Sequence, residues 1–298
     1  MKIRLGYEIT YAMPRPTPMI FTLNVHYSRV SDLLSPDVMR FSPSVEVQSY
    51  RDGFGNWCTR VVAPPGQLVV TADAVIRDSG EPDRVALEAR QVPVEQLPEE
   101  ALVFLLGSRY CETDRLSEIA WKRFEAVPPG WRRVQAICDF VHQHIKFGHV
   151  YANPTKTAWD VYQDRVGVCR DYAHLGVALC RCMNIPARYC TGYLGDIGVP
   201  VDGAMDFSGW FEVFLEGGWY TFDPRNNVPR IGRVLIARGR DAADVAISTT
   251  FGANTLQGFR VWTDEVAEAT VDAGKPSPHS ADANLSDAKP TEARALHN

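Results

Sequence analysis

The residues with the clearest capacity for chemistry lie in the run from Gly167 to Leu175, which reads Gly-Val-Cys-Arg-Asp-Tyr-Ala-His-Leu. A helix-compatible apolar run follows it and stops at Asn184-Ile185-Pro186. This pattern places Cys169 in the first turn of a predicted helix, where unpaired backbone N–H groups and the helix dipole favour a thiolate over a thiol. Because a thiolate is a nucleophile, the spacing predicts covalent chemistry at Cys169, provided that a base reaches it.

The other cysteines and histidines show no comparable pattern. The chain has seven cysteines at irregular spacings and no Cys-x-x-Cys pair, which predicts neither a disulfide framework nor a zinc site. We interpret most of them as small buried residues. His142 and His144 would point to different sides of a helix, and together with His149 they are predicted to be exposed or capping residues. We therefore expect no metal and no cofactor.

The composition is that of an ordinary globular protein, with 45% hydrophobic and 22% charged residues among 298. The net charge of −5 gives no reason to expect nucleic acid or an anionic membrane as a partner. The N-terminus lacks an apolar signal core, and no stretch has the uninterrupted apolar length of a membrane span. We expect a cytoplasmic protein.

The order of predicted elements divides the chain into four parts. Residues 1–80 alternate apolar and polar side chains between turn clusters, which predicts short strands and a β-sandwich-like domain. Residues 81–110 connect this domain to residues 111–268, where helices (116–126 and 131–145, and a short one capped by Thr155 or Thr157) precede strands and two closing strands (246–252 and 258–266). Residues 269–298 have almost no large apolar side chains, which predicts a disordered tail.

Three blocks then occur in an order that points to a known family. They are the Cys169 run, a strand-like segment over 184–193, and a hairpin-like segment over 210–223 that ends in Phe222-Asp223-Pro224. In these blocks the chain resembles the transglutaminase-like superfamily, in particular bacterial members described as candidate cysteine proteases. Residues 1–80 resemble the β-rich domain that precedes the core in such proteins.

The resemblance implies an α+β fold, in which an N-terminal β-sandwich-like domain is followed by a papain-like transglutaminase core with its nucleophile helix packed on an antiparallel sheet. It also implies a Cys–His–Asp triad, with Cys169 as the nucleophile and Asp223 as the carboxylate that orients the histidine. The acyl group would pass from a peptide, protein or small amide to water or to an amine.

The histidine of this triad has no counterpart at its expected place. Ser208 occupies that position, at the start of the first hairpin strand, and the blocks around Trp210 and Asp223 align beyond it without a gap. A serine neither accepts a proton near neutral pH nor forms an ion pair with a thiolate. The residues that would carry the chemistry are therefore Cys169, Asp223 and, in the place of the base, Ser208.

Other side chains offer weak substitutes for the missing base. His174 stands five residues beyond Cys169, about 7.5 Å further along the same predicted helix at 1.5 Å per residue, and we expect it to pack in the core. His149 can approach Cys169 only through the tertiary fold. Asp202 and Asp206 are near Ser208 in sequence, but a carboxylate beside the thiol would raise the thiol pKa.

Two hypotheses follow. In the first, the chain is a thiol acyl-transfer protein impaired by Ser208, since general acid–base help is typically worth about 10² to 10⁴ in rate. In this case Ser208 is either natural or a variant of an active enzyme, and the intact Cys169 and Asp223 favour a recent loss. In the second, the chain is a non-catalytic binding or scaffold protein on the same fold.

Overall fold

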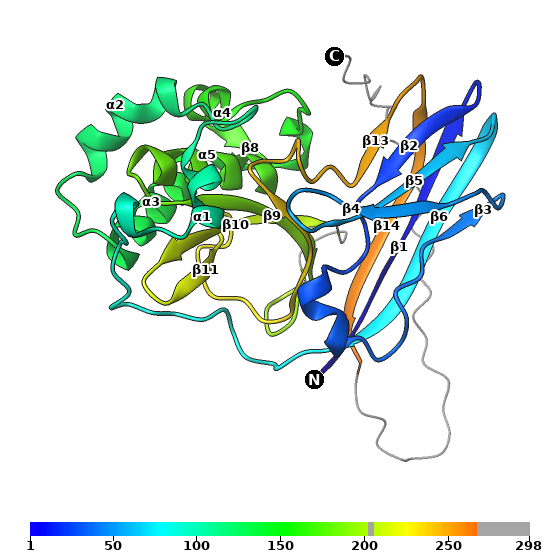
Figure 1. Cartoon of the computed structure of the whole chain (residues 1–298), viewed down its shortest axis with the longest axis horizontal. Helices are drawn as coiled ribbons and strands as arrows, with labels where there is room; N and C mark the ends of the chain where they lie inside the picture. Colours follow the sequence, from blue (N-terminus) through cyan, green and yellow to red (C-terminus); the bar gives the residue numbers. More distant parts are fainter. Residues whose placement is uncertain (202–205, 267–298) are drawn as a thin grey trace.

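The computed structural model describes residues 1–201 and 206–266, which form two parts lying side by side (Figure 1). One part is rich in strands, and the other combines helices with a further antiparallel sheet. This is the predicted α+β fold with a strand-rich N-terminal region. Within the described ranges, no helix has both the length and the apolar character needed to cross a membrane.

The strand-rich part consists of two four-stranded sheets, with strand orders β14-β1-β6-β3 and β13-β2-β5-β4. Side chains alternate between buried and exposed along much of β1 and β6, so that one face of each strand contributes to the core. The bounds of these elements are β1 Lys2–Met13, β2 Thr17–Phe21, η1 Tyr27–Asp32, β3 Arg40–Ser42, β4 Gln48–Arg51, β5 Trp57–Ala63, β6 Gly66–Arg77, β13 Ser248–Thr250 and β14 Thr255–Glu265.

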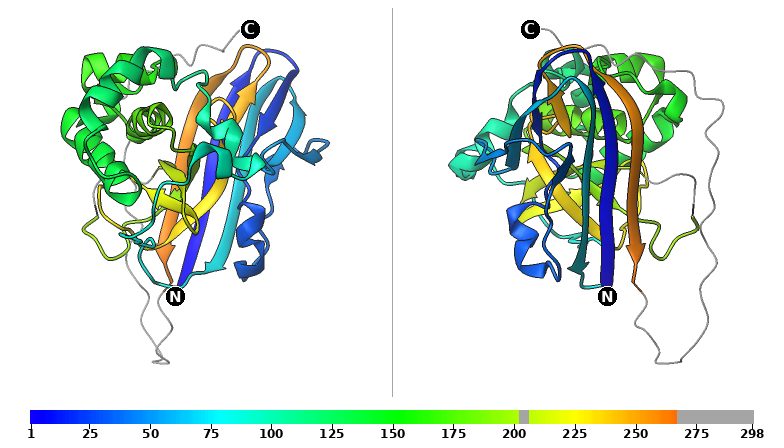
Figure 2. Two further views of the ribbon diagram at one scale, coloured as in Figure 1. Left: turned by 60° about the vertical axis from the view of Figure 1, so that its left-hand side comes forward. Right: turned by 90° about the vertical axis from the view of Figure 1, so that its right-hand side faces the viewer.

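The two strands at the C-terminal end of the described chain complete these sheets. We grouped their segments with residues 111–268, but β13 pairs with β2, and β14 pairs antiparallel with β1 from Ile3↔Glu265 to Ala12↔Thr255. Figure 2 (right) shows β14 in orange beside β1 in dark blue. A strand pattern predicts a strand without naming its neighbour, because pairing partners are chosen by the tertiary fold. The tail predicted at 269–298 lies outside the described residues.

The second part is built around α5, whose residues from Asp171 to Cys182 are all buried. This helix packs against β9 and β10 of the sheet β11-β10-β9-β12 and is covered by α2, α3 and α4. The elements are η2 Val94–Gln96, α1 Glu99–Leu102, η3 Val103–Leu105, α2 Thr113–Phe124, α3 Trp131–His144, β7 Lys146–Phe147, η4 His149–Tyr151, α4 Ala158–Asp164, β8 Val166–Gly167, α5 Cys169–Cys182, β9 Ala187–Leu194, β10 Ser208–Leu215, β11 Gly218–Phe222 and β12 Arg233–Gly239.

Local signals account for several of these boundaries. Thr157 caps α4 in a capping box with Asp160, which confirms one of the two predicted caps. Gly130, at φ +99°, precedes α3, and a Cβ there would lie 2.4 Å from the Ala89 carbonyl oxygen. Gly217 and Gly218 turn the β10–β11 hairpin at φ +90° and +123°.

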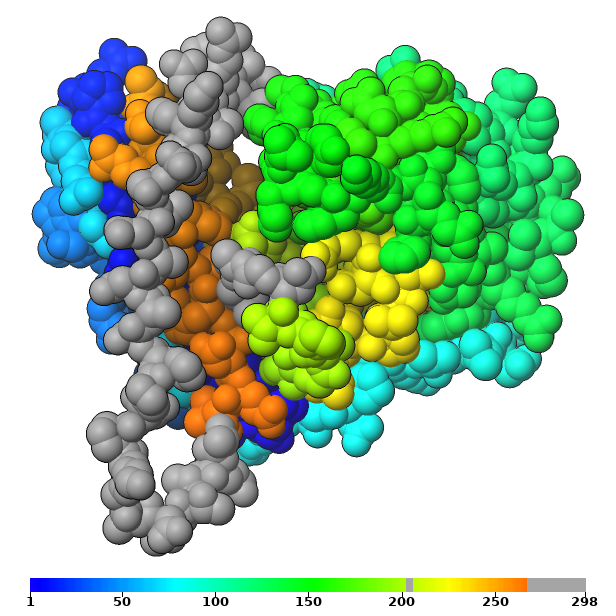
Figure 3. Space-filling view, turned by 180° about the vertical axis from the view of Figure 1, so that it is seen from behind, coloured from blue at the N-terminus to red at the C-terminus, as the bar shows by residue number. Residues whose placement is uncertain are grey.

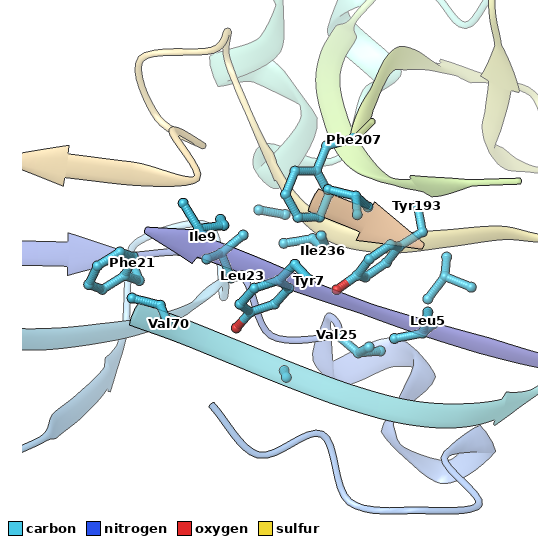
Figure 4. Close-up of a cluster of buried hydrophobic side chains, with 14 of the residues drawn as sticks. Leu5, Tyr7, Ile9, Phe21, Leu23, Val25, Val70, Tyr193, Phe207 and Ile236 are labelled. Atoms are coloured by element: carbon cyan, nitrogen blue, oxygen red, sulfur yellow. The ribbon is translucent and has the colours of Figure 1, made fainter. Parts of the chain in front are cut away.

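The described residues form two hydrophobic clusters. The first joins the strand-rich part to one face of the sheet β11-β10-β9-β12, and Figure 4 shows Tyr193 and Phe207 beside Leu5 and Tyr7. The Phe207 ring lies 6.1 Å from that of Tyr7 and 5.3 Å from that of Tyr193, measured between centroids. The second cluster lies between the helices and the other face of the same sheet. The N-terminal strands therefore anchor the residue that immediately precedes Ser208.

Candidate active site

Cys169 is positioned by the residues on either side of it. The backbone N–H of Val168 donates to Oδ2 of Asp171 at 2.9 Å, so a buried carboxylate satisfies the first donor of α5. Arg170 balances that carboxylate with an ion pair at 3.0 Å. Gly167 leaves space for it, since a Cβ there would lie 2.7 Å from Asp171 Oδ2. The contacts of residues 167–171 thus fix the start of α5.

A short parallel ladder brings His149 to the same place. Phe147 of β7 pairs with Gly167 of β8, and His149 and Cys169 each follow two residues later. The N–H of Gly148 also donates to the Gly167 carbonyl at 3.1 Å. The pairing of β7 with β8 therefore brings the segment of His149 next to the segment of Cys169.

Cys169, Ser208 and His149 line one cavity of about 670 Å³, together with Asp206 and four residues that follow β11. Segments 147–152 (green), 194–201 (yellow-green) and 225–230 (yellow) come together on the face shown in Figure 3. A cavity of this size is suited to a small ligand or to a short stretch of chain. Asp223 does not line it; this carboxylate borders a neighbouring cavity of about 370 Å³.

The electrostatic state of Cys169 differs from the prediction. Among the seven cysteines, all of them in the described ranges, six are buried and Cys169 is partly exposed. Desolvation nevertheless raises the pKa of the Cys169 thiol to about 11, against the lowering effect of a hydrogen bond with the Gly209 backbone. The charge of Asp206 raises this pKa further, as expected of a nearby carboxylate. A pKa in this range corresponds to a protonated thiol at neutral pH, and desolvation is its largest cause.

Ser208 begins β10 opposite Gly192 of β9, and its carbonyl accepts a hydrogen bond from Thr191 Oγ1 at 3.1 Å. The next residue, Gly209, has no room for a side chain, because a Cβ would lie 2.5 Å from the Tyr189 hydroxyl and 3.4 Å from the Arg170 Cα. The glycine lets this end of β10 approach the first turn of α5. Ser208, which the resemblance places at the position of the histidine, therefore lines the Cys169 cavity.

Asp223 is intact, but its acceptor sites are occupied. Oδ1 accepts from the backbone N–H groups of Arg225 and Asn226, both at 3.1 Å. Oδ2 accepts from Asn226 Nδ2 and Arg233 Nη2, both at 2.7 Å. Burial alone would raise the pKa of this carboxyl, but the Arg233 guanidinium and the Asn226 hydrogen bonds together hold it below its usual value. A carboxylate has about four acceptor sites, so all of them are in use.

Arg233, the ion-pair partner of Asp223, belongs to a wider ion-pair network. Arg233 also donates through Nε to both oxygens of Asp83, at 3.1 and 2.9 Å. Asp83 lies in the segment that connects the two parts of the chain, and its Oδ2 accepts from the Arg230 N–H at 2.9 Å. Asp223 therefore serves as one end of a structural clamp.

His174, His142 and His144 have partners elsewhere in the described part of the chain. His174 is buried, accepts at Nε2 from the Ala242 N–H at 3.1 Å, and stacks on Tyr110 with ring centroids 5.1 Å apart, which confirms the predicted core role. His142 Nδ1 lies 2.9 Å from the Pro224 carbonyl oxygen, and His144 Nε2 lies 2.8 Å from that of Tyr162. Asp202, considered above, lies outside the described residues.

Comparison with known proteins identifies the class to which this fold and site belong. Residues 122–224 match the model of the transglutaminase-like superfamily. A crystal structure from Cytophaga hutchinsonii, described as a candidate cysteine protease, is 31% identical, with 93% of this chain and 92% of that chain covered and a TM-score of 0.77. The chain belongs to the transglutaminase-like superfamily.

Two mycobacterial proteins are also similar. An uncharacterized protein of Mycobacterium leprae is 38% identical over 86 residues, which are 27% of this chain and 30% of that protein. An uncharacterized protein of Mycobacterium tuberculosis is 25% identical over 215 residues, covering 65% of this chain and 68% of the relative. The chain thus spans less than a third of the first of these relatives.

Sequence reasoning missed the residues that separate Asp223 from the cavity. Arg225 and Asn226 follow Asp223-Pro224 directly, and Arg230 stands shortly after them; all three line the cavity that contains Cys169. Their closeness in sequence to Asp223 was the available signal. The sequence did not show which way each of these side chains points, because that depends on the turn after β11.

Proposed function

We propose that this chain is a thiol acyl-transfer protein whose cavity binds an amide substrate at Cys169 and whose turnover is impaired by Ser208. The observation that carries the proposal is the arrangement of the cavity, which Cys169 and Ser208 line together while Asp223 lies behind Asn226. The substrate class is a peptide, protein or small amide, and the proposed location is cytoplasmic. The unpaired state of all seven cysteines supports that location.

The proposed chemistry identifies the step that would fail. The Cys169 sulfur would attack the amide carbon, forming an S–C bond, and the C–N bond would break once the leaving nitrogen gained a proton. Water or an amine would then release the acyl group. With a thiol pKa of about 11, roughly one molecule in ten thousand carries the thiolate at pH 7. Ser208 supplies neither the ion pair that would lower this pKa nor the proton for the leaving amine.

The test is a variant that restores the missing base. Ser208→His is compared with the parent protein for hydrolysis of amide substrates and for transfer of the acyl group to a primary amine. We expect activity to appear with the histidine and to disappear again in the Ser208→His/Cys169→Ala double variant. A folded Ser208→His protein with no activity, alone or with Asp223 freed as described in the Discussion, overturns the proposal.

The second candidate function is a binding or scaffold role without turnover. Two observations favour it: the four acceptor sites of Asp223 are filled, and Cys169 is protonated at neutral pH. The same variants discriminate between the candidates, because a cavity converted to binding alone would not gain activity from a single histidine.

A further inference from the structure

Arg225 and Arg230 line the Cys169 cavity, and both donate hydrogen bonds to the side-chain oxygen of Asn226. Arg230 Nη1 donates to Asn226 Oδ1 at 2.9 Å, and Arg225 Nη1 donates to the same oxygen at 3.3 Å. The other end of the Asn226 amide is fixed, because its Nδ2 donates to Asp223 at 2.7 Å. The orientation of the amide is thus set by partners on both sides. It holds two guanidinium groups together without supplying negative charge.

The carboxylates near Arg230, Asp196 and Asp223, also interact with other groups. Arg230 is 7% exposed, its Nη2 donates to the Gly195 carbonyl at 3.0 Å, and its ion pair with Asp196 is long, at 3.6 Å. Its Nε is buried and has no hydrogen-bond partner among the described residues. The Arg225 guanidinium stacks over the Phe147 ring at 4.1 Å and donates to the neutral Asn226 oxygen. Two like charges in a partly desolvated wall repel each other, and an anion placed between them would relieve that repulsion.

We propose that Arg225 and Arg230 form an anion subsite that binds a carboxylate of the amide substrate. The inference rests on the proposed function, since it assigns the charged end of a substrate whose amide lies at Cys169. Guanidinium groups match the planar geometry of a carboxylate through paired N–H donors. Asp206 lines the same cavity, so a ligand with a single negative charge is favoured over a dianion.

The subsite also gives the substrate a direction. Asp206 adjoins Phe207 and Ser208 at the start of β10, whereas the two arginines follow β11. A substrate carboxylate would be repelled by Asp206 and would bind the two arginines. The subsite therefore selects an amide that carries a free carboxylate close to the bond under attack. Both a peptide C-terminus and an acidic side chain have this chemistry.

Alkylation of Cys169 tests the subsite without requiring turnover. Iodoacetate and iodoacetamide each form an S–C bond and release iodide, and they differ chiefly in the carboxylate. The rate constants at Cys169 are measured by mass spectrometry of its peptide at low salt, and their ratio is compared with that of N-acetylcysteine. Because both reagents need the same thiolate, the ratio is independent of the thiol pKa. We expect the ratio to favour iodoacetate by roughly tenfold over the free thiol and to fall at high salt.

Substitutions locate the effect. Arg225→Gln should bring the ratio close to that of the free thiol, and Arg230→Lys, which keeps a charge in the buried position, should lower it while preserving the fold. Arg84→Gln is the matched control, since Arg84 lines the neighbouring cavity and not that of Cys169. A wild-type ratio equal to that of N-acetylcysteine overturns the subsite. A raised ratio that neither Arg225→Gln nor Arg230→Lys changes also overturns it.

Protection experiments separate the sources of the carboxylate. Short acetylated peptides with a free C-terminus, with an amidated C-terminus, and with an amidated C-terminus plus a glutamate are tested for slowing the reaction of Cys169 with iodoacetamide. Protection by the first or third peptide but not the second supports the subsite and names the source. No protection by any carboxylate, or stronger protection by inorganic phosphate than by acetate, overturns it. These outcomes do not depend on Ser208→His, so either proposal can fail alone.

Discussion

The candidate site has two ends, one at Cys169 and one at Asp223, and their surroundings differ. At the Cys169 end the supporting residues are in place: the Asp171 carboxylate caps α5, and Gly167 and Gly209 allow the close approaches that position the thiol. The position proposed for the base holds Ser208, which does not accept a proton near neutral pH. At the Asp223 end the carboxylate is present and charged, but Asn226 and Arg233 have taken up its acceptor sites.

Under the proposed function, this difference means that Cys169 and Asp223 are both retained without the contact that a triad requires. In that proposal Ser208 stands in the place of the base, and Asn226 occupies the carboxylate that would orient it. Each end is also held by structural bonds that would preserve it without catalysis, because Asp171 and Asp223 stabilise the fold through their own partners.

The largest expected effect comes from reconnecting the ends. Ser208→His supplies a base, but its imidazole would find Asp223 already occupied by Asn226. We therefore expect Ser208→His/Asn226→Ala to exceed Ser208→His in amide hydrolysis, with both gains falling within the range of about 10² to 10⁴ of general acid–base catalysis. Initial rates with a chromogenic amide measure this. Equal rates for the two variants would show that Asn226 does not block Asp223.

The next effect concerns the clamp at the Asp223 end. Arg233→Ala would leave Asp223 and Asp83 buried without their shared cation, and we expect a loss of about 3 to 5 kcal/mol in the free energy of unfolding. Urea denaturation at pH 7 measures it. Arg90→Ala is the control, since Arg90 forms an exposed pair with Glu216 at 2.8 Å, and solvent screens such pairs. Similar losses for both variants would contradict a structural role specific to Arg233.

A smaller effect concerns the protonation of Cys169. Because its pKa is raised to about 11, the thiolate fraction should grow tenfold per pH unit from pH 7 to 10, whereas an ordinary thiol levels off above its pKa of about 8.5. At pH 7 we expect iodoacetamide to react with Cys169 at least about ten times more slowly than with N-acetylcysteine. This figure allows for the higher nucleophilicity of a more basic thiolate. A plateau below pH 9 would exclude the raised pKa.

The smallest effect separates the causes of that pKa. Asp206 raises the pKa of Cys169 less than desolvation does, so Asp206→Asn should move the pH profile of alkylation to lower pH by a fraction of a unit. The rate at pH 8 would then increase by roughly twofold to threefold. Asp264→Asn, a change of an exposed residue on β14 outside this cavity, is the control and should leave the profile unchanged. A shift to higher pH in Asp206→Asn would contradict the assigned sign.

Much of the local structure followed from the sequence. The cap at Thr157 and the hairpin over 210–223 each depend on residues close in the chain, so their patterns are visible in one segment. Position 208 was assigned from the resemblance, because the blocks around Trp210 and Asp223 align without a gap. The closing strands were recognised as strands, but their partners β1 and β2 lie more than 200 residues away.

The sequence by itself determined which side chains are available: a cysteine at a helix start, an aspartate after a hairpin, and a serine where a base is expected. The tertiary structure alone decided their states. It desolvated Cys169 and so raised the pKa of its thiol, joined Asp223 to Arg233 and Asn226, and brought His149 and two arginines to the cavity. The physical reason is that pKa values and hydrogen-bond partners depend on neighbours brought together by folding, whereas helix starts and turns depend on residues adjacent in the chain.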